Sequence, residues 1–268
     1  MSNAEAPIGV FDSGIGGLTV AQEVIRQLPQ ESLIYFGDTA RVPYGPKSPD
    51  TVRRYSREIA GFLRDQGVKS IVIACNTATA HALAALRDEM DMPVIGVVEP
   101  GARAAVAATK AGHIGVIGTV GTIKSGAYER AIRAIDPDVV ITVRACPLFV
   151  PLVEEGWTDH DATRLIAQEY LEPMLAAQID TLVLGCTHYP LLKPLLHSVL
   201  GSSVRLIDSA EETAAETART LRAAGLEIAT NTIPSYRFVA SDDPLQFLQL
   251  GQRFLGSAME GVEIRTLG

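Results

Sequence analysis

Two cysteines stand at the ends of two short apolar runs, and this setting is typical of reactive thiols. Cys75 closes the run at residues 71–74, and Cys186 closes the run at residues 182–185. A short, bounded apolar run predicts a buried strand of a parallel sheet, and such sheets bind ligands beyond the carboxyl ends of their strands. A helical pattern follows each cysteine, and the amides and dipole at a helix start lower the pKa of a thiol. The pattern therefore predicts two activated thiols that face one small anionic substrate.

The elements that must position these thiols predict an α/β fold with mostly parallel sheets. Strand-like apolar runs alternate along the chain with helical patterns, as expected when helices cover the faces of a parallel sheet. The expected strands are residues 7–11, 33–36, 70–74, 93–98, 113–117, 139–143, 181–185, 204–207 and 236–240. The main expected helices are residues 18–28, 49–67, 77–89, 102–111, 161–178, 191–200, 209–225 and 244–255.

Two similar α/β series follow one another along the chain. Ile114 repeats Ile8 after 106 residues, and Cys186 repeats Cys75 after 111 residues. These close offsets favour an internal duplication, although any two α/β units share some likeness. Because the Glu-Pro-Gly segment at residues 99–101 interrupts the pattern, we expect a domain crossing there. The first domain would comprise residues 1–98 plus 209–268 with Cys75, and the second would comprise residues 99–208 with Cys186.

A pair of thiols related by such a duplication has a specific chemical use. One thiolate removes a proton from a carbon centre, and a thiol on the opposite face delivers another, which inverts the centre. In the reverse direction the two roles exchange. This pseudo-symmetry suits substrates that are mirror images at one carbon, so the pattern favours a racemase.

The composition disfavours several other classes of protein. With 47% hydrophobic and 20% charged residues among 268, the chain can build full cores and is not typical of disorder. A net charge of -8 disfavours a nucleic-acid partner, which needs a basic surface. No apolar run approaches a membrane span and no signal peptide is evident, so we expect no membrane association and a cytoplasmic location. Three cysteines do not suggest a disulfide framework.

Several motifs resemble those of the glutamate racemases, a branch of the cofactor-independent aspartate/glutamate racemase superfamily. They are residues 9–17, the Tyr44-Gly45 pair, residues 74–78 and residues 184–190. The resemblance runs from about Pro7 to the last helix. It implies two similar α/β domains related by a pseudo-two-fold, with the active site in the cleft between them. It also implies interconversion of L- and D-glutamate, which supplies D-glutamate for peptidoglycan and cell-wall synthesis.

The resemblance further implies roles for individual residues. Cys75 and Cys186 would form the acid/base pair, with Asp12, His188 and Glu154 assisting them. The substrate site would be lined by Asp12, Ser13, Tyr44, Gly45, Asn76, Thr77, Thr187 and His188. The choice of Glu154 over the adjacent Glu155 rests on the resemblance alone. Relatives also imply that Cys75 serves D-glutamate and Cys186 serves L-glutamate, which the residues by themselves leave open.

Simpler structural roles stand beside these assignments. Cys146 has no strand-end setting, and because unpaired thiols are among the most buried side chains, we assign it to packing. Asp12 could cap the following helix, and the Tyr44-Gly45 pair could be only a turn. An isolated histidine is most often structural, but His188 lies two residues from a thiol and could tune its protonation.

Other functions are compatible with the same residues. The chain could be a racemase of aspartate or a hydantoin, a redox protein in which Cys75 and Cys186 form a reversible disulfide, or a small-anion binding protein. The absence of a Cys-x-x-Cys motif argues against the redox function. None of the five lysines has an evident pyridoxal-phosphate setting and no spacing suggests zinc, so we expect no cofactor and no metal. A homodimer is compatible with the sequence.

Overall fold

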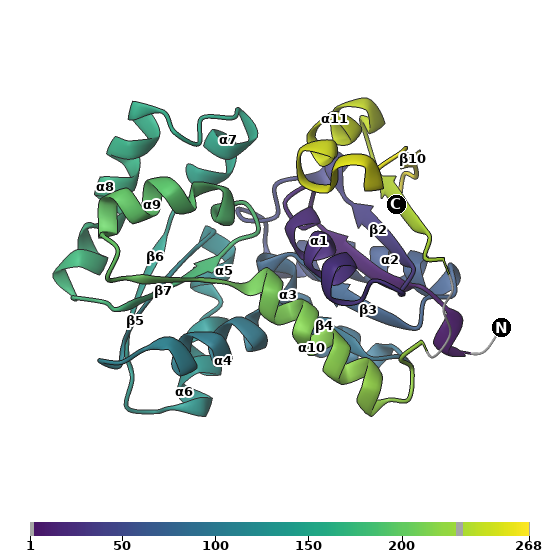
Figure 1. Cartoon of the computed structure of the whole chain (residues 1–268), viewed down its shortest axis with the longest axis horizontal. Helices are drawn as coiled ribbons and strands as arrows, with labels where there is room; N and C mark the ends of the chain where they lie inside the picture. Colours follow the sequence, from purple (N-terminus) through teal and green to yellow (C-terminus); the bar gives the residue numbers. More distant parts are fainter. Residues whose placement is uncertain (1–2, 229–232, 268) are drawn as a thin grey trace. The chain divides into compact units, whose positions relative to one another are not determined.

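The computed structural model describes residues 3–228 and 233–267, and this part of the chain forms two compact units. Unit 1 comprises Met1–Val97 and Ala210–Gly268, and unit 2 comprises Val98–Ser209. Each unit contains one sheet with helices on both faces (Figure 1). The chain thus leaves unit 1, builds unit 2, and returns to complete unit 1.

Unit 1 is built on a parallel sheet of six strands. Their order is β10-β9-β2-β1-β3-β4, and every pairing between neighbours is parallel. The strands are β1 (Ile8–Asp12), β2 (Leu33–Gly37), β3 (Ser70–Ile73), β4 (Val94–Gly96), β9 (Tyr236–Ala240) and β10 (Glu263–Ile264). All residues of β1, β2 and β3 are buried, as expected for strands that helices cover on both faces.

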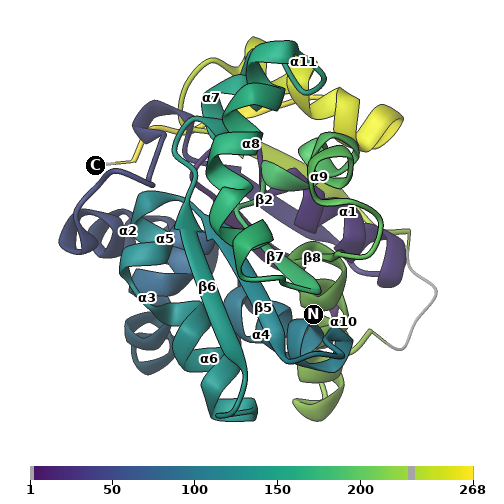
Figure 2. The ribbon, with the colours of Figure 1, turned by 90° about the vertical axis from the view of Figure 1, so that its left-hand side faces the viewer.

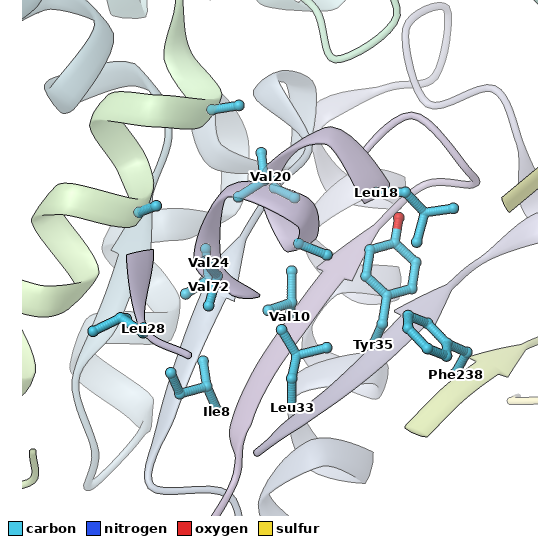
Figure 3. Packing of buried hydrophobic residues seen from close by; sticks show 14 of the residues in the cluster. Ile8, Val10, Leu18, Val20, Val24, Leu28, Leu33, Tyr35, Val72 and Phe238 are labelled. Atoms are coloured by element: carbon cyan, nitrogen blue, oxygen red, sulfur yellow. The ribbon is translucent and has the colours of Figure 1, made fainter. Parts of the chain in front are cut away.

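Five helices cover this sheet. One core lies between the sheet and α1 (Leu18–Gln27), α10 (Ser209–Ala223) and α11 (Pro244–Leu255), and Figure 3 shows part of it. The other core lies between the sheet and α2 (Pro49–Asp65) and α3 (Asn76–Glu89). Ser48 caps α2 and Pro49 occupies its first turn, which are the residue types that favour a helix start.

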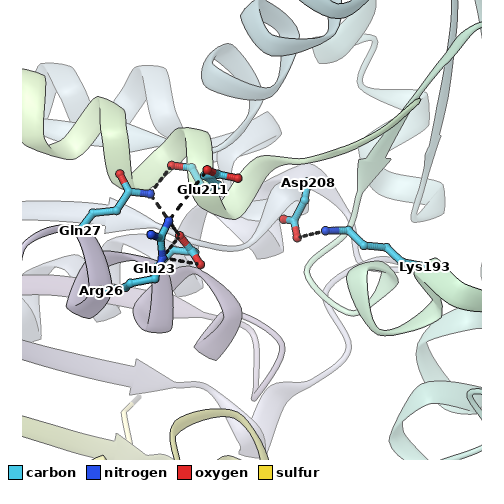
Figure 4. Close-up of polar contacts among 6 residues, drawn as sticks. All are labelled: Glu23, Arg26, Gln27, Lys193, Asp208 and Glu211. Atoms are coloured by element: carbon cyan, nitrogen blue, oxygen red, sulfur yellow. Dashed lines mark hydrogen bonds and ion pairs between the residues drawn. The ribbon is translucent and has the colours of Figure 1, made fainter. Parts of the chain in front are cut away.

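Segments far apart in the sequence are joined inside unit 1. Gln27 of α1 donates to the backbone oxygen of Glu211 in α10 at 3.0 Å (Figure 4). A buried ion pair joins Lys69 to Glu31 at 2.5 Å, and Lys69 also donates to the backbone oxygen of Ala4. Because leaving one buried charge without its partner is strongly destabilising, the pair ties the segment before β2 to the start of β3, and the bond to Ala4 adds the N-terminal segment.

Unit 2 is built on a parallel sheet of four strands in the order β6-β5-β7-β8 (Figure 2). The strands are β5 (His113–Gly118), β6 (Val140–Ala145), β7 (Thr181–Gly185) and β8 (Arg205–Asp208). One face is covered by α4 (Val98–Ala108) and α6 (Ala127–Ile135), and the other by α7 (Phe149–Glu154), α8 (Asp161–Ala176) and α9 (Lys193–Leu200). A short helix, α5 (Val120–Lys124), follows β5. An ion pair of 2.8 Å joins Lys193 to Asp208 (Figure 4).

The predicted α/β class with parallel sheets is confirmed, and the interruption of the pattern expected at residues 99–101 is wrong. The Glu-Pro-Gly segment at residues 99–101 does not interrupt the secondary structure, because it lies in the first turns of α4. Proline is tolerated there because the first amides of a helix have no intrahelical partner. The four strands β1–β4 and the four strands β5–β8 follow the same order, second-first-third-fourth, and each cysteine of interest follows the third strand of its set.

Candidate active site

Cys75 lies between β3 and α3, at the carboxyl end of the sheet in unit 1. It is the N-cap residue of α3, and its Sγ accepts a hydrogen bond of 3.4 Å from the amide of Ala78. Its Sγ is also hydrogen-bonded to Ser13 Oγ at 3.7 Å. Only 6% of Cys75 is exposed. The helix-start amide favours negative charge on the sulfur, and the thiol donates to the hydroxyl of Ser13, so this setting suits a thiol that alternates with a thiolate.

Asp12 and Ser13 stand beside Cys75 because β1 and β3 are paired neighbours. Asp12 is fully buried, and its Oδ2 accepts hydrogen bonds of 3.1 Å from the amides of Gly14 and Gly17. A Cβ at Gly17 would lie 2.5 Å from the Cβ of Asp12 and 2.8 Å from the hydroxyl of Tyr35, so only glycine fits there. Asp12 thus organises the turn that presents Ser13.

Tyr44 and Gly45 belong to the loop that follows β2, and both are buried. The Tyr44 hydroxyl donates to the carboxylate of Asp38. Burial raises the pKa of Tyr44, and the negative charges of Asp38 and Cys75 add to the shift. Tyr44 therefore stays protonated as a donor and lies within electrostatic range of the Cys75 thiol. Asn76 and Thr77, in the first turn of α3, are also buried.

Cys186 occupies the matching position in unit 2, but the element after it differs from the one expected. A turn through Thr187 and His188 and a 3-10 helix, Tyr189–Leu192, precede α9, so no α-helix starts at this cysteine. Cys186 Sγ lies 3.9 Å from Nδ1 of His188. The helix-start argument made from the sequence therefore holds for Cys75 and fails for Cys186, whose neighbour is an imidazole.

His188 connects Cys186 to a carboxylate. Its Nε2 lies 3.0 Å from Oε1 of Glu154, at the end of α7, and only 5% of His188 is exposed. A carboxylate on one ring nitrogen favours a proton there and orients the other nitrogen toward the thiol. The carboxylate that His188 meets is that of Glu154. Thr187 is 6% exposed beside it.

Aromatic packing explains why α7 reaches the turn after β7. Tyr189 is fully buried, and its hydroxyl donates to the backbone oxygen of Cys146 at 2.8 Å. The ring of Tyr189 packs edge-on against Phe149, the first residue of α7, with centroids 5.3 Å apart. Edge-to-face pairs of this kind add about 0.5–1.5 kcal/mol beyond their buried area. The packing holds Glu154 within reach of His188.

Cys146 differs from the other two cysteines. It is fully buried in the core of unit 2, and burial raises the pKa of its thiol well above the usual value. It therefore stays protonated and belongs to the packing, as expected. Within residues 3–228 and 233–267, no group of three or more histidine, cysteine or acidic side chains could hold a metal ion. None of the helices described is long and apolar enough to cross a membrane.

Each unit thus assembles its own set of the residues singled out from the sequence. Unit 1 groups Asp12, Ser13, Cys75, Asn76 and Thr77, with Tyr44 and Gly45 in the adjoining loop, and unit 2 groups Cys186, Thr187, His188 and Glu154. Sequence reasoning missed Asp38 and Arg41, which hold the Tyr44 loop. A signal was present, because Asp38 directly follows a strand, as Asp12 ends one.

Comparisons with known proteins define the class of this chain. A model of the Asp/Glu/Hydantoin racemase family matches residues 8–217. The glutamate racemase of Geobacter metallireducens is 56% identical over 255 residues, which are 95% of this chain and 94% of that protein. The structure of glutamate racemase isoform RacE1 from Bacillus anthracis has a TM-score of 0.93 and 43% identity, over 99% of this chain and 98% of that one. A Francisella tularensis glutamate racemase in complex with D-glutamate has a TM-score of 0.92 and 39% identity, over 98% of each chain.

The chain therefore belongs to the Asp/Glu/hydantoin racemase family. Within this family its enzymatic activity is that of a glutamate racemase, which makes it an isomerase. The resemblance drawn from the sequence motifs is confirmed.

Proposed function

We propose that Cys75 and Cys186 interconvert L- and D-glutamate as a two-base pair without a cofactor. The observation that carries this proposal is that each thiol follows the third strand of its set and has its own polar partner, Ser13 for Cys75 and His188 for Cys186. A general acid/base pair needs polar partners that hold each group in place, and each thiol has one.

The proton balance of a turnover follows from the two thiols. The thiolate of one cysteine removes the α-proton of glutamate and becomes a thiol, while the electron pair of the C–H bond stays on the α-carbon. The thiol of the other cysteine gives its proton to the opposite face and becomes a thiolate. The product is the enantiomer, and the two cysteines have exchanged protonation states. Solvent protons restore the starting state before the next turnover.

We further propose that the polar residues around the thiols bind glutamate. Ser13, Tyr44, Gly45, Asn76, Thr77 and Thr187 would contact its carboxylates and ammonium group, with Asp12 and His188 beside the two thiols. All of these residues except the partly exposed Ser13 are buried, which supports this assignment because donors shielded from water stabilise the charge that develops on the substrate. The D-glutamate complex of the Francisella tularensis relative is consistent with this class of ligand.

The cellular role follows from the activity. D-glutamate is the product expected to enter peptidoglycan, and a cytoplasmic enzyme acting on free glutamate is the form that we propose. The support for this role is membership of the family and near-full-length similarity to glutamate racemases.

The test is racemisation of L-glutamate in deuterated water with no added cofactor. We would follow optical activity and α-deuterium uptake for the wild type, Cys75→Ser and Cys186→Ser, with Cys146→Ser as the matched control. Because each site thiol serves as acid or base in every turnover, each substitution should lower the rate by about 10²- to 10⁴-fold, and the control should retain activity. Full activity in either site variant would overturn the two-thiol mechanism. Turnover of aspartate but not glutamate would redirect the substrate assignment.

A further inference from the structure

Asp38 is a fully buried carboxylate at the end of β2, and the residues that it binds come from two distant parts of unit 1. It accepts hydrogen bonds from the hydroxyl of Tyr44, from Nε of Arg41 at 2.7 Å, and from Oγ of Ser241 at 2.9 Å. Buried carboxylates are rare unless they are fully paired, and this one is held by three donors. The loop after β2 is therefore organised around one acid.

Arg41 is itself fixed in place by its neighbours. Besides Asp38 it donates to Glu58 of α2, and its guanidinium lies 4.0 Å from the centroid of the Tyr55 ring. Burial alone would lower the pKa of Arg41, but Glu58 and Asp38 outweigh it and raise the pKa. Arg41 thus stays charged, and it links the loop to α2.

The C-terminal return of the chain supplies the rest of the support. Ser241 follows β9, and its Oγ also accepts the amide of Ala40 at 2.9 Å. Thr39 Oγ1 donates to the backbone oxygen of Asp242 at 2.6 Å and accepts the amide of Asp242 at 2.8 Å. Residues 241–242 lie outside the stretch matched by the family model, which covers residues 8–217. The loop that carries Tyr44 is therefore pinned by a segment far from it in sequence.

We propose that Asp38 is a positioning residue that, with Arg41 and Ser241, holds the Tyr44–Gly45 loop in the conformation that binds glutamate. The inference rests on the proposed substrate role of Tyr44 and Gly45. The backbone amide of Asp38 donates to the oxygen of Asp12 at 3.1 Å, so the loop is also tied to the turn beside Cys75. Asp38 meets no reacting atom; it acts through the loop that it orders.

The effect of such a residue should fall on substrate binding. Both enantiomers use the same loop, and they have equal free energies in solution, so the ratio kcat/KM must change equally for both. Asp38→Asn keeps the size of the side chain but removes the charge that Arg41 and Tyr44 address. We expect KM to rise on the order of tenfold for L- and for D-glutamate, with kcat changed less than about threefold.

Three further variants keep the test decisive. Ser241→Ala removes one donor to Asp38 and should raise KM by about threefold, and Tyr44→Phe should act in the same direction. Asp242→Asn is the matched control, because its exposed carboxylate accepts a hydrogen bond from the amide of Asp243 and none from Asp38, Arg41 or Tyr44, and it should leave both constants unchanged. If Asp38→Asn does not fold, Ser241→Ala and Tyr44→Phe carry the test.

The outcomes separate this inference from the function on which it rests. A wild type that does not racemise glutamate would overturn the proposed function. If the wild type is active but KM is unchanged in Asp38→Asn, the positioning role alone is overturned. If Asp38→Asn does not fold, unchanged KM in Ser241→Ala and Tyr44→Phe overturns it in the same way. A loss of kcat at constant KM would also overturn it, because that result would place the loop in transition-state stabilisation rather than in binding.

Discussion

The two units share a strand order but surround their thiols with different chemistry. In unit 1, Cys75 starts an α-helix, receives an amide hydrogen bond and meets the hydroxyl of Ser13. In unit 2, Cys186 enters a turn and meets an imidazole that is backed by the carboxylate of Glu154. The two units therefore combine the same strand order with different polar partners for the thiol.

This difference is instructive because the substrates are mirror images. Enantiomers have equal free energies, so the two directions of racemisation must have the same kcat/KM whatever the two environments are. With this ratio fixed, the asymmetry of the site can appear in kcat and KM taken separately and in which proton transfer limits each direction. Substrate isotope effects report that step, and they are the natural way to test the comparison.

The largest expected effect comes from removing the imidazole next to Cys186. His188→Asn should lower kcat by about 10²-fold, because Cys186 loses the imidazole that lies 3.9 Å from its sulfur. Proton transfer at Cys186 then becomes limiting. If Cys186 is the base for L-glutamate, the α-deuterium isotope effect should grow with L-glutamate and shrink with D-glutamate, as measured from initial rates. Equal growth for both enantiomers would contradict separate roles for the two thiols.

The mirror-image experiment perturbs the other thiol. Ser13→Ala removes a single hydroxyl next to Cys75, whose helix-start amide remains. We therefore expect kcat to fall by about tenfold, which corresponds to ~1.4 kcal/mol. The isotope effect should now grow with D-glutamate rather than with L-glutamate. The pair of variants sharpens the comparison, because the same pattern in both would show that one thiol performs both proton transfers.

A smaller effect is expected from the carboxylate behind His188. The side chain of Glu154 is 38% exposed, so its pairing with His188 should be worth no more than about 1 kcal/mol. Glu154→Gln should therefore lower kcat by a factor of roughly five, with the same isotope pattern as His188→Asn. Glu155→Gln is the control and should behave as the wild type. If Glu155→Gln lowered kcat more than Glu154→Gln, the carboxylate that assists His188 would be Glu155.

The smallest expected effect is on folding stability, and it concerns the residues that precede β3 and β7, the strands that lead to the two cysteines. Lys69 precedes β3 and is buried in an ion pair, whereas Asp180 precedes β7 and accepts hydrogen bonds. Burial would raise the pKa of Asp180, but bonds from Thr109 and from the amides of Ala111 and Lys110 outweigh it and lower the pKa to about 2.

The lowered pKa of Asp180 makes folding stability depend on pH. The pKa of Asp180 is lower in the folded state than the usual value of about 3.9 in the unfolded chain. Its contribution to stability is therefore present above about pH 4 and is lost as the pH falls toward 2. Because Asp180 is only partly buried, solvent screening keeps the contribution below the ~2.6 kcal/mol that a shift of this size would otherwise give. Unfolding of Asp180→Asn between pH 5 and 2 should show a weaker acid dependence than the wild type, and an unchanged dependence would remove this role.

Much of the fold could be predicted from the sequence because it depends on local patterns. Buried parallel strands appear as continuous apolar runs, so β7 lies at its expected residues, and the helical pattern at residues 244–255 is confirmed as α11. The segment at residues 99–101 misled prediction because Pro100 is a helix breaker in the interior of a helix but not in its first turns. The helix expected at residues 191–200 is present as α9 (Lys193–Leu200), but a turn and the 3-10 helix Tyr189–Leu192 separate it from Cys186, so its start does not reach the thiol.

The candidate site shows the same division. Cys75 and Cys186 were found from strand-end patterns, which are local. Asp38 was missed because its partners, Arg41 and Ser241, come from segments about 200 residues apart, and only the paired strands β2 and β9 bring them together. Contacts of this kind depend on the strand order, which periodicity along the chain does not reveal.

The measurement that tests the two-thiol proposal most directly is the isotopic composition of the first product. Protonated L-glutamate is mixed with the enzyme in deuterated water, and the D-glutamate formed in the earliest turnovers is separated and analysed by mass spectrometry. Two thiols on opposite faces predict that essentially every D-glutamate molecule carries an α-deuteron, while the unreacted L-glutamate keeps its proton. Transfer of the original proton into early D-glutamate would contradict the proposal, because it would require one group to remove and return the same proton.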